Sequence, residues 1–387
     1  MTVIGRLRAF FQAPEAKRSA VAPLIALQGL GQPQWTPRNY AALAREGFAA
    51  NAIGYRCVRM IAESAAAVPW LVYEGAKERD RHPLLDLLAR PNPGVTGRDL
   101  LESFYGHLQV AGNAYLEAVR LDGQVRELHV LRPDRMKAVA GPNGWPEAYE
   151  YSVSGSSVRL AQGDAVLHLR LFNPLNDYYG MSPLEAAARG VDIHNAAGAW
   201  SKAVLDNAAR PSGALMYKGI EGAPNLTAEQ FARLKSELHA SFQGAGNAGR
   251  PMVLEGGLDW KPMSFSPRDM DFIETRNAAA REIALAFGVP PMLLGIPGDN
   301  TYANYAEANR SLWRQTVLPL VGRTADALTQ FLGPSFGSEL RLGYDADQIE
   351  ALSTEREALW SRVGAASFIS DDEKRAAVGY GTQVAES

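Results

Sequence analysis

The hydrophobic pattern of this chain switches from a helical to a strand period near residue 112. Before that point apolar residues recur three or four positions apart, whereas from Ala114 to Leu171 they alternate with polar ones. A helix places every third or fourth residue on one face and a strand every second residue, so the two patterns require different backbones. The chain is therefore predicted to be α+β, with helices first and an antiparallel sheet after them.

The helical part has defined beginnings and ends. A helix is expected from Asn51 to Val68 and is ended by Pro69, with a short strand following at Trp70–Tyr73. A short helix is expected at 82–90, and Thr96 is placed to cap the next one. The apolar stripe of that next helix is predicted to be core: Leu100, Leu101, Phe104, Tyr105 and Leu108.

The alternating part begins with a hairpin signal. Residues 115–121 and 125–131 alternate on either side of Asp122-Gly123, a pair that suits a tight hairpin turn. Further strands are expected at 136–140, 148–153, 157–160 and 165–171, with turns at Pro142-Asn143-Gly144 and Ser154-Gly155.

Two later helices carry unusual faces. The helix after Pro183, to about residue 208, has a stripe of mostly small residues, which allows close helix packing: Ala188, Val191, Asn195, Ala199 and Ala203. A helix at 266–287 alternates acidic and basic residues and is interpreted as a solvated or intersubunit face. Residues 210–265 between them are mixed, with strands at 216–217 and 252–254 and a helix from Thr227 to Phe242.

The last third is expected to be helical. Val289-Pro290-Pro291 must end the helix at 266–287, and a loop then runs to about residue 303. A helix follows at 302–332, and Pro319 inside it predicts a kink. The tail after Gly343 is interpreted as mostly helical, with Ser370 and Glu373 at capping-box spacing and with Asp345-Ala-Asp347 as a helix cap rather than a calcium loop.

Composition narrows the class of protein. The 387 residues suggest two or three domains, and residues 13–50, with four prolines, an irregular arm. A net charge of −3 argues against a protein that grips nucleic acid through clustered cations. The single cysteine, Cys57, excludes a disulfide framework or a cysteine zinc site within one chain. The basic start lacks a signal-peptide core, and no apolar run reaches membrane-spanning length, so a non-secreted product made in the cytoplasm is expected.

Catalytic signatures are scarce. Gly244–Gly249 matches G-x-G-x-x-G, but a helix is expected before it and a strand after it, the reverse of a dinucleotide site, so a turn is favoured. No phosphate-binding P-loop, nucleophile elbow or H-E-x-x-H occurs, and the six histidines are scattered. No catalytic, cofactor-binding or metal-binding residue is therefore predicted, and the chain is expected not to be an enzyme.

Several segments, in order, resemble the phage portal protein family. They are Asn51-Ala-Ile-Gly-Tyr-Arg-Cys with Val68-Pro-Trp, His82-Pro-Leu-Leu, Pro91-Asn-Pro, Gly112-Asn-Ala-Tyr, Val166-Leu-His-Leu, Tyr179-Gly-Met-Ser-Pro-Leu, Arg281-Glu-Ile-Ala-Leu-Ala-Phe-Gly-Val-Pro-Pro-Met-Leu-Leu-Gly and Thr316-Val-Leu-Pro. Each motif alone is weak, but their order covers about residues 50–335. A composition rich in Ala, Gly and Arg favours a gene transfer agent or a related temperate phage.

The resemblance implies a portal fold: a mixed helix and antiparallel-sheet wing, a two-helix stem, a small clip, a long kinked helix and a short helical crown. The implied parts are an N-terminal arm at 1–39, the wing at 40–182, stem helices at 184–209 and 266–287, the clip at 210–265, a tunnel loop at 288–303, the long helix and its connection at 304–344 and the crown at 345–387.

The resemblance also implies a function: a structural head–tail connector in the virion, made in the host cytoplasm. Its subunits would form a dodecameric ring at one capsid vertex, through which DNA is packaged and ejected. The implied partners are the major capsid protein, the large subunit of the terminase motor, a head–tail adaptor and double-stranded DNA, held weakly and non-specifically. No cofactor is implied.

A channel for DNA must not grip phosphate, and each neutralised phosphate strengthens binding. One segment of the tunnel loop is expected to face DNA: Gly295, Ile296, Pro297, Gly298, Asp299, Asn300 and Thr301, a stretch with one acidic residue and no cation. Three alternatives remain open: a head–tail adaptor ring, a hydrolase using Asp and His on the sheet, and a basic DNA-binding module, which the net charge disfavours.

Overall fold

The computed structural model of the protein describes residues 35–206, 213–217, 258–262, 272–298, 302–337 and 339–381, with isolated positions between 227 and 236. Contacts divide the chain into one unit at 1–35 and a second at 36–387, and every named helix and strand below belongs to the second. None of the described helices combines the length and the apolar character that a membrane span requires.

The segment after residue 39 is helical, not irregular as predicted for all of 13–50. It forms α2 (Tyr40–Ala42) and a π-helical turn, η1 (Leu43–Ala49). Asn39 caps α2 by accepting a hydrogen bond from the Ala42 amide at 3.0 Å. The prolines that suggested an arm all precede this cap, and Leu43 is buried in the main core.

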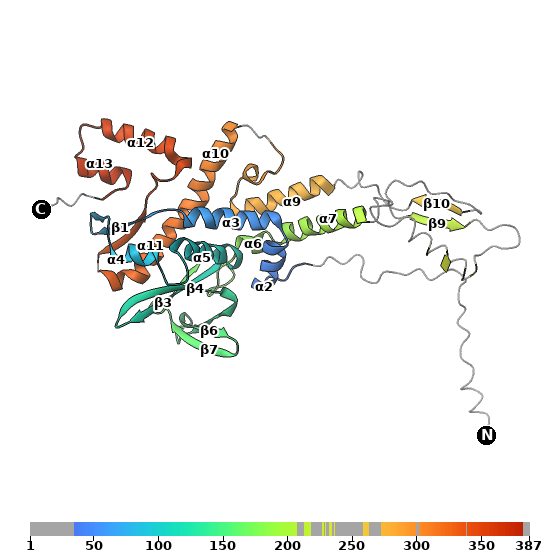
Figure 1. Ribbon diagram of the computed structural model, residues 1–387, viewed down its shortest axis with the longest axis horizontal. Coiled ribbons are helices and arrows are strands. Elements are labelled where there is room, and N and C mark those ends of the chain that lie inside the picture. Colours follow the sequence, from blue (N-terminus) through green and yellow to red (C-terminus); the bar gives the residue numbers. More distant parts are fainter. Residues whose placement is uncertain are drawn as a thin grey trace, which may run out of the picture. The chain divides into compact units, whose positions relative to one another are not determined.

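Two helices form the centre of the body. In α3 (Ala52–Ala66) and α5 (Gly97–Ala111) the predicted stripes face the core, and Figure 1 shows the two helices adjacent. Thr96 and Asp99 form a capping box at the start of α5, which confirms the predicted cap. The short helix α4 (Pro83–Ala89) follows His82, whose side chain accepts a hydrogen bond from the Leu84 amide.

A glycine allows the chain to turn from α5 into the sheet. Gly112 has φ +71°, and a Cβ there would lie 2.5 Å from the carbonyl carbon of Met181. Its carbonyl accepts a hydrogen bond from the Leu171 amide at 2.8 Å. Only glycine combines this backbone conformation with so close an approach, so helix, sheet and the segment before residue 183 meet here.

The predicted strands form two antiparallel sheets, which Figure 1 shows below α5. One has the order β4-β3-β8 and the other β5-β6-β7. Their bounds match the prediction closely: β3 (Asn113–Leu121), β4 (Gln124–Leu131), β5 (Met136–Ala140), β6 (Pro146–Val153), β7 (Ser156–Ala161) and β8 (Val166–Arg170). A small core joins the sheets: Tyr115, Leu131, Met136, Tyr149, Leu160 and Val166.

A third sheet contains a strand that the sequence analysis missed. β11 (Leu340–Tyr344) pairs antiparallel with β1 (Trp70–Glu74), whose other edge pairs with β2 (Lys77–Arg79). The segment was assigned to a connection and a helical tail. Its alternation is short and interrupted by Gly343, and its partner strand is distant in sequence, so local pattern could not identify it.

The chain leaves the body and returns through two helices. α6 (Pro183–Ala186) leads into α7 (Ala188–Asp206), and α9 (Phe272–Phe287) runs back. Between them the structure describes β9 (Gly213–Tyr217) paired with β10 (Leu258–Pro262). β9 was predicted and β10 was not. The strand expected at 252–254, the Gly244–Gly249 turn and most of the helix expected at 227–242 lie outside the described residues.

The predicted long helix is a continuous helical path in three parts. They are α10 (Tyr302–Leu312), the π-helical turn η5 (Trp313–Val317) and α11 (Leu318–Phe336). Pro319 lies in the first turn of α11, directly after η5. Proline lacks an amide donor and excludes the preceding helical carbonyl, which explains why the regular α-helix is interrupted here.

The C-terminal segment packs on the β1 side of the body. It comprises η6 (Glu350–Leu352), α12 (Ser353–Ala365) and α13 (Asp371–Val378), and Ser370 with Glu373 forms the predicted capping box. The interpretation of Asp345 and Asp347 as helix caps is wrong. Their carboxylates bind Arg356, Trp360 and Tyr380 instead, so they connect α12 to the chain end rather than cap a helix.

Candidate functional site

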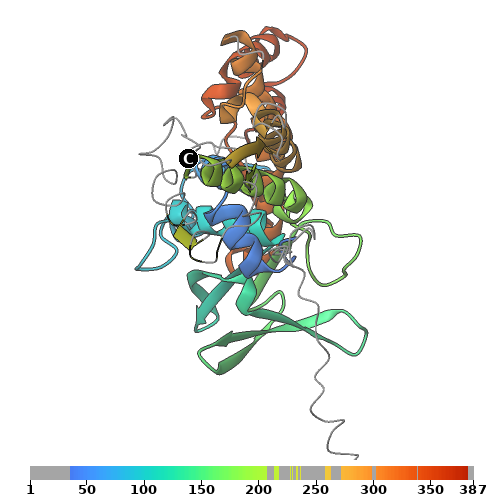
Figure 2. The same ribbon diagram turned by 90° about the vertical axis from the view of Figure 1, so that its right-hand side faces the viewer.

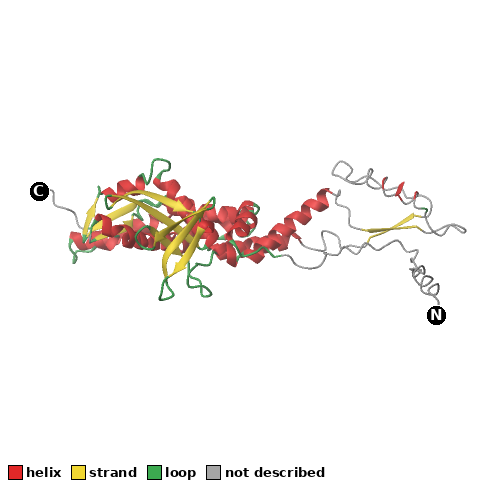
Figure 3. Ribbon diagram, turned by 90° about the horizontal axis from the view of Figure 1, so that it is seen from below, coloured by secondary structure: helices red, strands yellow, loops and turns green. Residues whose placement is uncertain are grey.

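The helix pair α7 and α9 is the feature of the fold nearest to the expected site. The helices lie side by side in Figure 1, and Figure 3 shows helix, in red, extending beyond the sheets of the body. Pairings between them run in opposite directions along the chain: Gly190 lies beside Ala279 and Glu282, and the ring of Trp200 stacks on that of Phe272 at 3.8 Å. The pair is therefore antiparallel, and its close approach relies on small residues where it meets the body.

A buried polar cluster ties this pair to α3. Asn51, 1% exposed, accepts hydrogen bonds from the Ile53 and Gly54 amides and so caps α3. Its side-chain amide contacts His194 Nδ1 at 3.2 Å and donates to Asn195 Oδ1 at 2.9 Å. One side chain thus fixes the start of α3 against the middle of α7.

His194 continues the cluster to α9. Its Nε2 accepts a hydrogen bond from Arg276 Nε at 3.3 Å. Burial lowers the pKa of His194, and the neighbouring guanidinium of Arg276 lowers it further. The neutral imidazole accepts a hydrogen bond from the Arg276 guanidinium and thereby links α7 to α9. Together with the contacts of Asn51, this bond sets the orientation of the α7–α9 pair on the body.

A tight turn ends α9. Gly288 has φ +64°, and a Cβ there would lie 2.7 Å from the hydroxyl of Thr316. That hydroxyl donates to the Gly288 carbonyl at 2.8 Å, so the turn is fastened to η5. Pro291 then begins a 3₁₀ turn, η4 (Pro291–Leu294), inside the segment that was predicted to be an unstructured loop.

The described half of the predicted DNA-facing segment folds back on α9. Gly295, Pro297 and Gly298 are exposed, whereas Ile296 is 5% exposed and packs against Ala280 and Ala284. In the protomer the Ile296 side chain therefore points into the protein. Asp299, Asn300 and Thr301 lie outside the described residues. That this segment faces DNA stays a prediction.

A cation lies closer to this segment than the sequence analysis inferred. Arg281 on α9 donates to the Pro297 carbonyl at 2.5 Å. Together with the packing of Ile296, this bond holds residues 295–298 against α9 and places the guanidinium of Arg281 beside a segment that itself contains no cation. The sequence analysis noted basic residues in the helix expected at 266–287. Only the fold shows which of its arginines contacts the loop.

The sheet histidines do not form an acid–base pair with aspartate. His168 stacks on Tyr115 at 4.3 Å and bonds to Tyr149 Oη and Asn113 Oδ1 at 2.7 and 2.9 Å. Burial and, to a smaller extent, the neighbouring charge of Arg170 lower the pKa of His168 to about 3. The ring of His129 bonds to Glu127, two residues away on the same strand, at 2.9 Å. This arrangement gives no support to the hydrolase alternative.

The other side chains that could carry out chemistry, the Cys57 thiol and possible metal ligands, are not arranged as a reactive site in the described residues. Burial raises the pKa of the Cys57 thiol to about 12, so the thiol stays protonated at neutral pH. Within the part of the chain that the structure describes, no three His, Cys, Asp or Glu side chains gather as a metal site would need. His239 and Asp269 lie outside that part.

The family model with the description "Phage portal protein" matches residues 52–379. A chain in the neck of a native gene transfer agent particle, computed with C12 symmetry, is 53% identical, covers 92% of this chain and 97% of its own length, and superposes with a TM-score of 0.69. A protein of Rickettsia bellii is 43% identical over 86% of this chain and 88% of its own length.

The probable portal protein of Streptomyces phage phiC31 is 29% identical over 84% of this chain and 73% of its own length. The family match spans all three described sheets of the body and the antiparallel helix pair. On this evidence the chain belongs to the phage portal protein family.

Proposed function

We propose that this chain is a structural ring subunit at one capsid vertex, through which double-stranded DNA is packaged and ejected. The observation that carries the proposal is the α7–α9 pair. It leaves a body that has its own core, yet α9 exposes Ile273 and Leu285, 75% and 79% of whose surfaces are accessible. Large exposed apolar side chains on a well-anchored helix are typical of a surface that neighbouring subunits cover.

The ring is proposed to be a dodecamer, with α7 and α9 as its stem and the body before residue 183 as its wing. Residues 210–265 would be the clip and those after 345 the crown. The related gene transfer agent neck was computed with C12 symmetry, which supports this subunit number. The match to portal proteins also favours a portal over a head–tail adaptor.

The proposed partners are those that the resemblance to portal proteins implies. The chain has no phosphate-binding P-loop motif, so the energy for packaging is proposed to come from the large terminase subunit, and the portal itself is proposed not to be an enzyme. The clip is proposed to contact that motor and, later, the head–tail adaptor, while the wing contacts the major capsid protein. DNA would pass with weak, non-specific contacts.

Native mass spectrometry and electron microscopy of the purified full chain test the ring. The expected result is one cyclic species with a central hole wide enough for a DNA duplex. A monomer at every concentration tried would contradict the proposal. ATP hydrolysis by the purified chain, abolished by a point substitution in it, would contradict the division of labour with the motor.

The channel position of the tunnel loop has its own test. Replacing Asp299 and Asn300 with lysine adds two positive charges and removes one negative charge per subunit, which should slow DNA movement and make it more sensitive to salt. The matched control makes the same change of charge at exposed positions away from the loop, Glu357→Lys with Gln124→Lys. If both variants package DNA at the same rate across a salt series, the loop does not face the channel.

A further inference from the structure

The loop between β8 and α6, residues 171–182, presents two large apolar side chains to solvent. Phe172 is 82% exposed and Leu175 is 85% exposed. The two residues lie three positions apart on this loop. Isolated exposed apolar residues are common on protein surfaces, but a Phe and a Leu three positions apart on one short loop, both this exposed, form a projecting apolar knob. We call Phe172 and Leu175 the knob.

The knob stands on a loop that is held rigid by hydrogen bonds. Asn173 accepts from the Leu175 amide at 2.9 Å and donates to the Tyr179 carbonyl at 3.0 Å. Asn176 accepts from the amides of Tyr178 and Tyr179. The Tyr178 hydroxyl donates to the Gly144 carbonyl at 2.6 Å, which attaches the loop to the β5–β6 hairpin. A preorganised apolar projection loses little conformational freedom when it binds.

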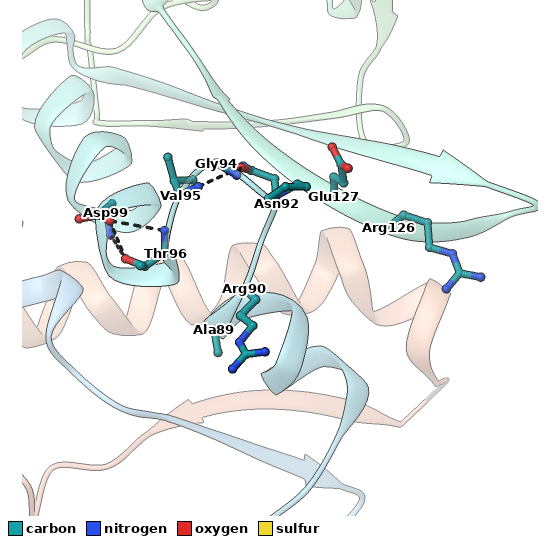
Figure 4. Close-up of a pocket in the computed structure, with 10 residues that line it drawn as sticks. Ala89, Arg90, Asn92, Gly94, Val95, Thr96, Asp99, Arg126 and Glu127 are labelled. Carbon is teal, nitrogen blue, oxygen red and sulfur yellow. Dashed lines mark hydrogen bonds between the residues drawn. The ribbon is translucent and has the colours of Figure 1, made fainter.

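The same chain carries a groove of matching chemistry. A cavity of about 440 Å³ lies between the end of α3, α4 and the start of α5, with apolar walls that include Val68, Leu85, Leu88 and Leu101. It adjoins a wider hollow of about 690 Å³, shown in Figure 4, and the two share Ala89 and Thr96. We call the two together the α4 groove.

Arginines rim the α4 groove. Arg98 borders the apolar cavity, and Arg90 and Arg126 border the wider hollow, where Figure 4 shows both side chains reaching outward. Asp99 and Glu127 also line the wider hollow, but Asp99 is bonded to the Thr96 cap and Glu127 to His129. None of the three arginines forms an ion pair or a side-chain hydrogen bond with another described residue. The occupant of this groove should therefore be apolar at its tip and acidic beside it.

We propose that the knob of one subunit inserts into the α4 groove of the next subunit in the ring. The loop supplies both required features, because exposed Asp177 follows Leu175 by two positions. The N-terminal arm offers another apolar segment, but residues 1–34 carry four basic residues and one acidic residue, which the arginine rim would repel. The inference rests on the proposed ring.

The positions of the knob loop and the groove suit a cyclic assembly. In Figure 2 the green loop before α6 and the light-blue segment around α4 project from opposite sides of the body. A ring closes when one patch of each subunit meets a different patch of its neighbour. A projection on one side and a groove on the other meet that requirement.

Cysteine crosslinking of the assembled full-length protein tests the contact. The variant pairs Leu175→Cys with Ala89→Cys, and the native Cys57 is fully buried and stays out of the reaction. Mild oxidation should give a ladder of crosslinked oligomers on non-reducing gels. The matched control pairs Leu175→Cys with Leu121→Cys, another exposed side chain, and should give no ladder.

A second measurement covers the case in which the cysteine pair is poorly aligned. Phe172→Ser with Leu175→Ser should raise the protein concentration needed for half-maximal assembly roughly a hundredfold, since two large apolar side chains lose their burial. Phe368→Ser, at an equally exposed phenylalanine, is the control. Intact rings with no ladder and unchanged assembly would overturn the contact while leaving the ring in place. A wild-type chain that forms no ring would instead overturn the proposed function.

Discussion

The two helix pairs of this protein, α3 with α5 and α7 with α9, are stabilised in different ways. The first pair buries large side chains almost completely, with Ile61 and Leu108 at 0% exposure and Phe104 at 1%. The second meets through small residues and one polar cluster near the body, and further along it Ala199, Ala203 and Ile273 are exposed. The first pair thus has its own core. The stability of the second pair depends on its contacts near the body and, we propose, on neighbouring subunits.

The difference separates the stability of the subunit from the stability of the assembly. Substitutions in the first pair should unfold the subunit, because a core cavity costs free energy that no neighbour restores. Substitutions on the outer half of the second should leave the subunit folded and weaken the ring. The following predictions test this separation, and equal effects in both pairs would refute it.

The largest expected effect is that of Phe104→Ala in α5. It should lower the free energy of unfolding by about 3–5 kcal/mol, since the side chain is buried and leaves a cavity. Urea unfolding followed by circular dichroism measures the change. Leu285→Ala on exposed α9 is the control and should change little; similar losses in both would show that the helix pairs do not differ.

Acidification should destabilise the body through His168. Its folded-state pKa lies below the ordinary 6.5, so the unfolded chain binds the proton more readily and stability is lost as pH falls below 6.5. At pH 4.5 the loss is about 2.7 kcal/mol, two pH units at about 1.36 kcal/mol each. His168→Gln should therefore show a smaller loss between pH 7 and 4.5 than the wild type. The same loss in both would assign the acid sensitivity elsewhere, with His129→Gln, at a partly exposed histidine on β4, as the reference.

An intermediate loss of stability is expected when the polar cluster that joins the two helix pairs is broken. Asn51→Ala removes the cap of α3 and the contacts of Asn51 with His194 and Asn195, which should cost about 1–2 kcal/mol. His194 keeps its bond from Arg276, and Asn195 keeps its bond to the Glu46 carbonyl. Asn39→Ala, which removes the cap of the three-residue helix α2, should cost less. Thermal unfolding compares them, and an equal cost would show that the contacts with α7 contribute nothing.

The smallest effect on the subunit is expected at the outer half of α9. Ile273→Ser should change the free energy of unfolding by less than about 0.5 kcal/mol, since the side chain is exposed. It should nevertheless lower the fraction of assembled rings in native mass spectra. Serine at exposed Val158 in β7 is the control for both measurements, and rings equally stable in both variants would place Ile273 outside any intersubunit contact.

Local signals allowed much of the body to be predicted. Thr96 with Asp99 marks the start of a helix, and Asp122-Gly123 marks a hairpin, because each acts over a few residues through its own hydrogen bonds or dihedral angles. Features that join distant segments were missed. β11 needs β1 to exist as a strand, and Asp345 and Asp347 bind Tyr380, more than thirty residues away.

The candidate site shows the same division. Val289-Pro290-Pro291 was sufficient to predict where α9 ends, because proline excludes a helix whatever surrounds it. The packing of residues 295–298 could not be predicted in the same way. Burial of Ile296 depends on α9 lying beneath it, and the bond from Arg281 to Pro297 depends on the distance between them in the fold.

The sequence by itself thus determined the class of fold, the main elements of the body and, through ordered motifs, the family. Period, caps and turns act locally, and motif order survives without any knowledge of contacts. Only the tertiary structure decided which polar groups meet, which apolar side chains stay exposed and where the α4 groove lies. Those properties arise when segments far apart in the chain come together, and no local pattern encodes the distance between them.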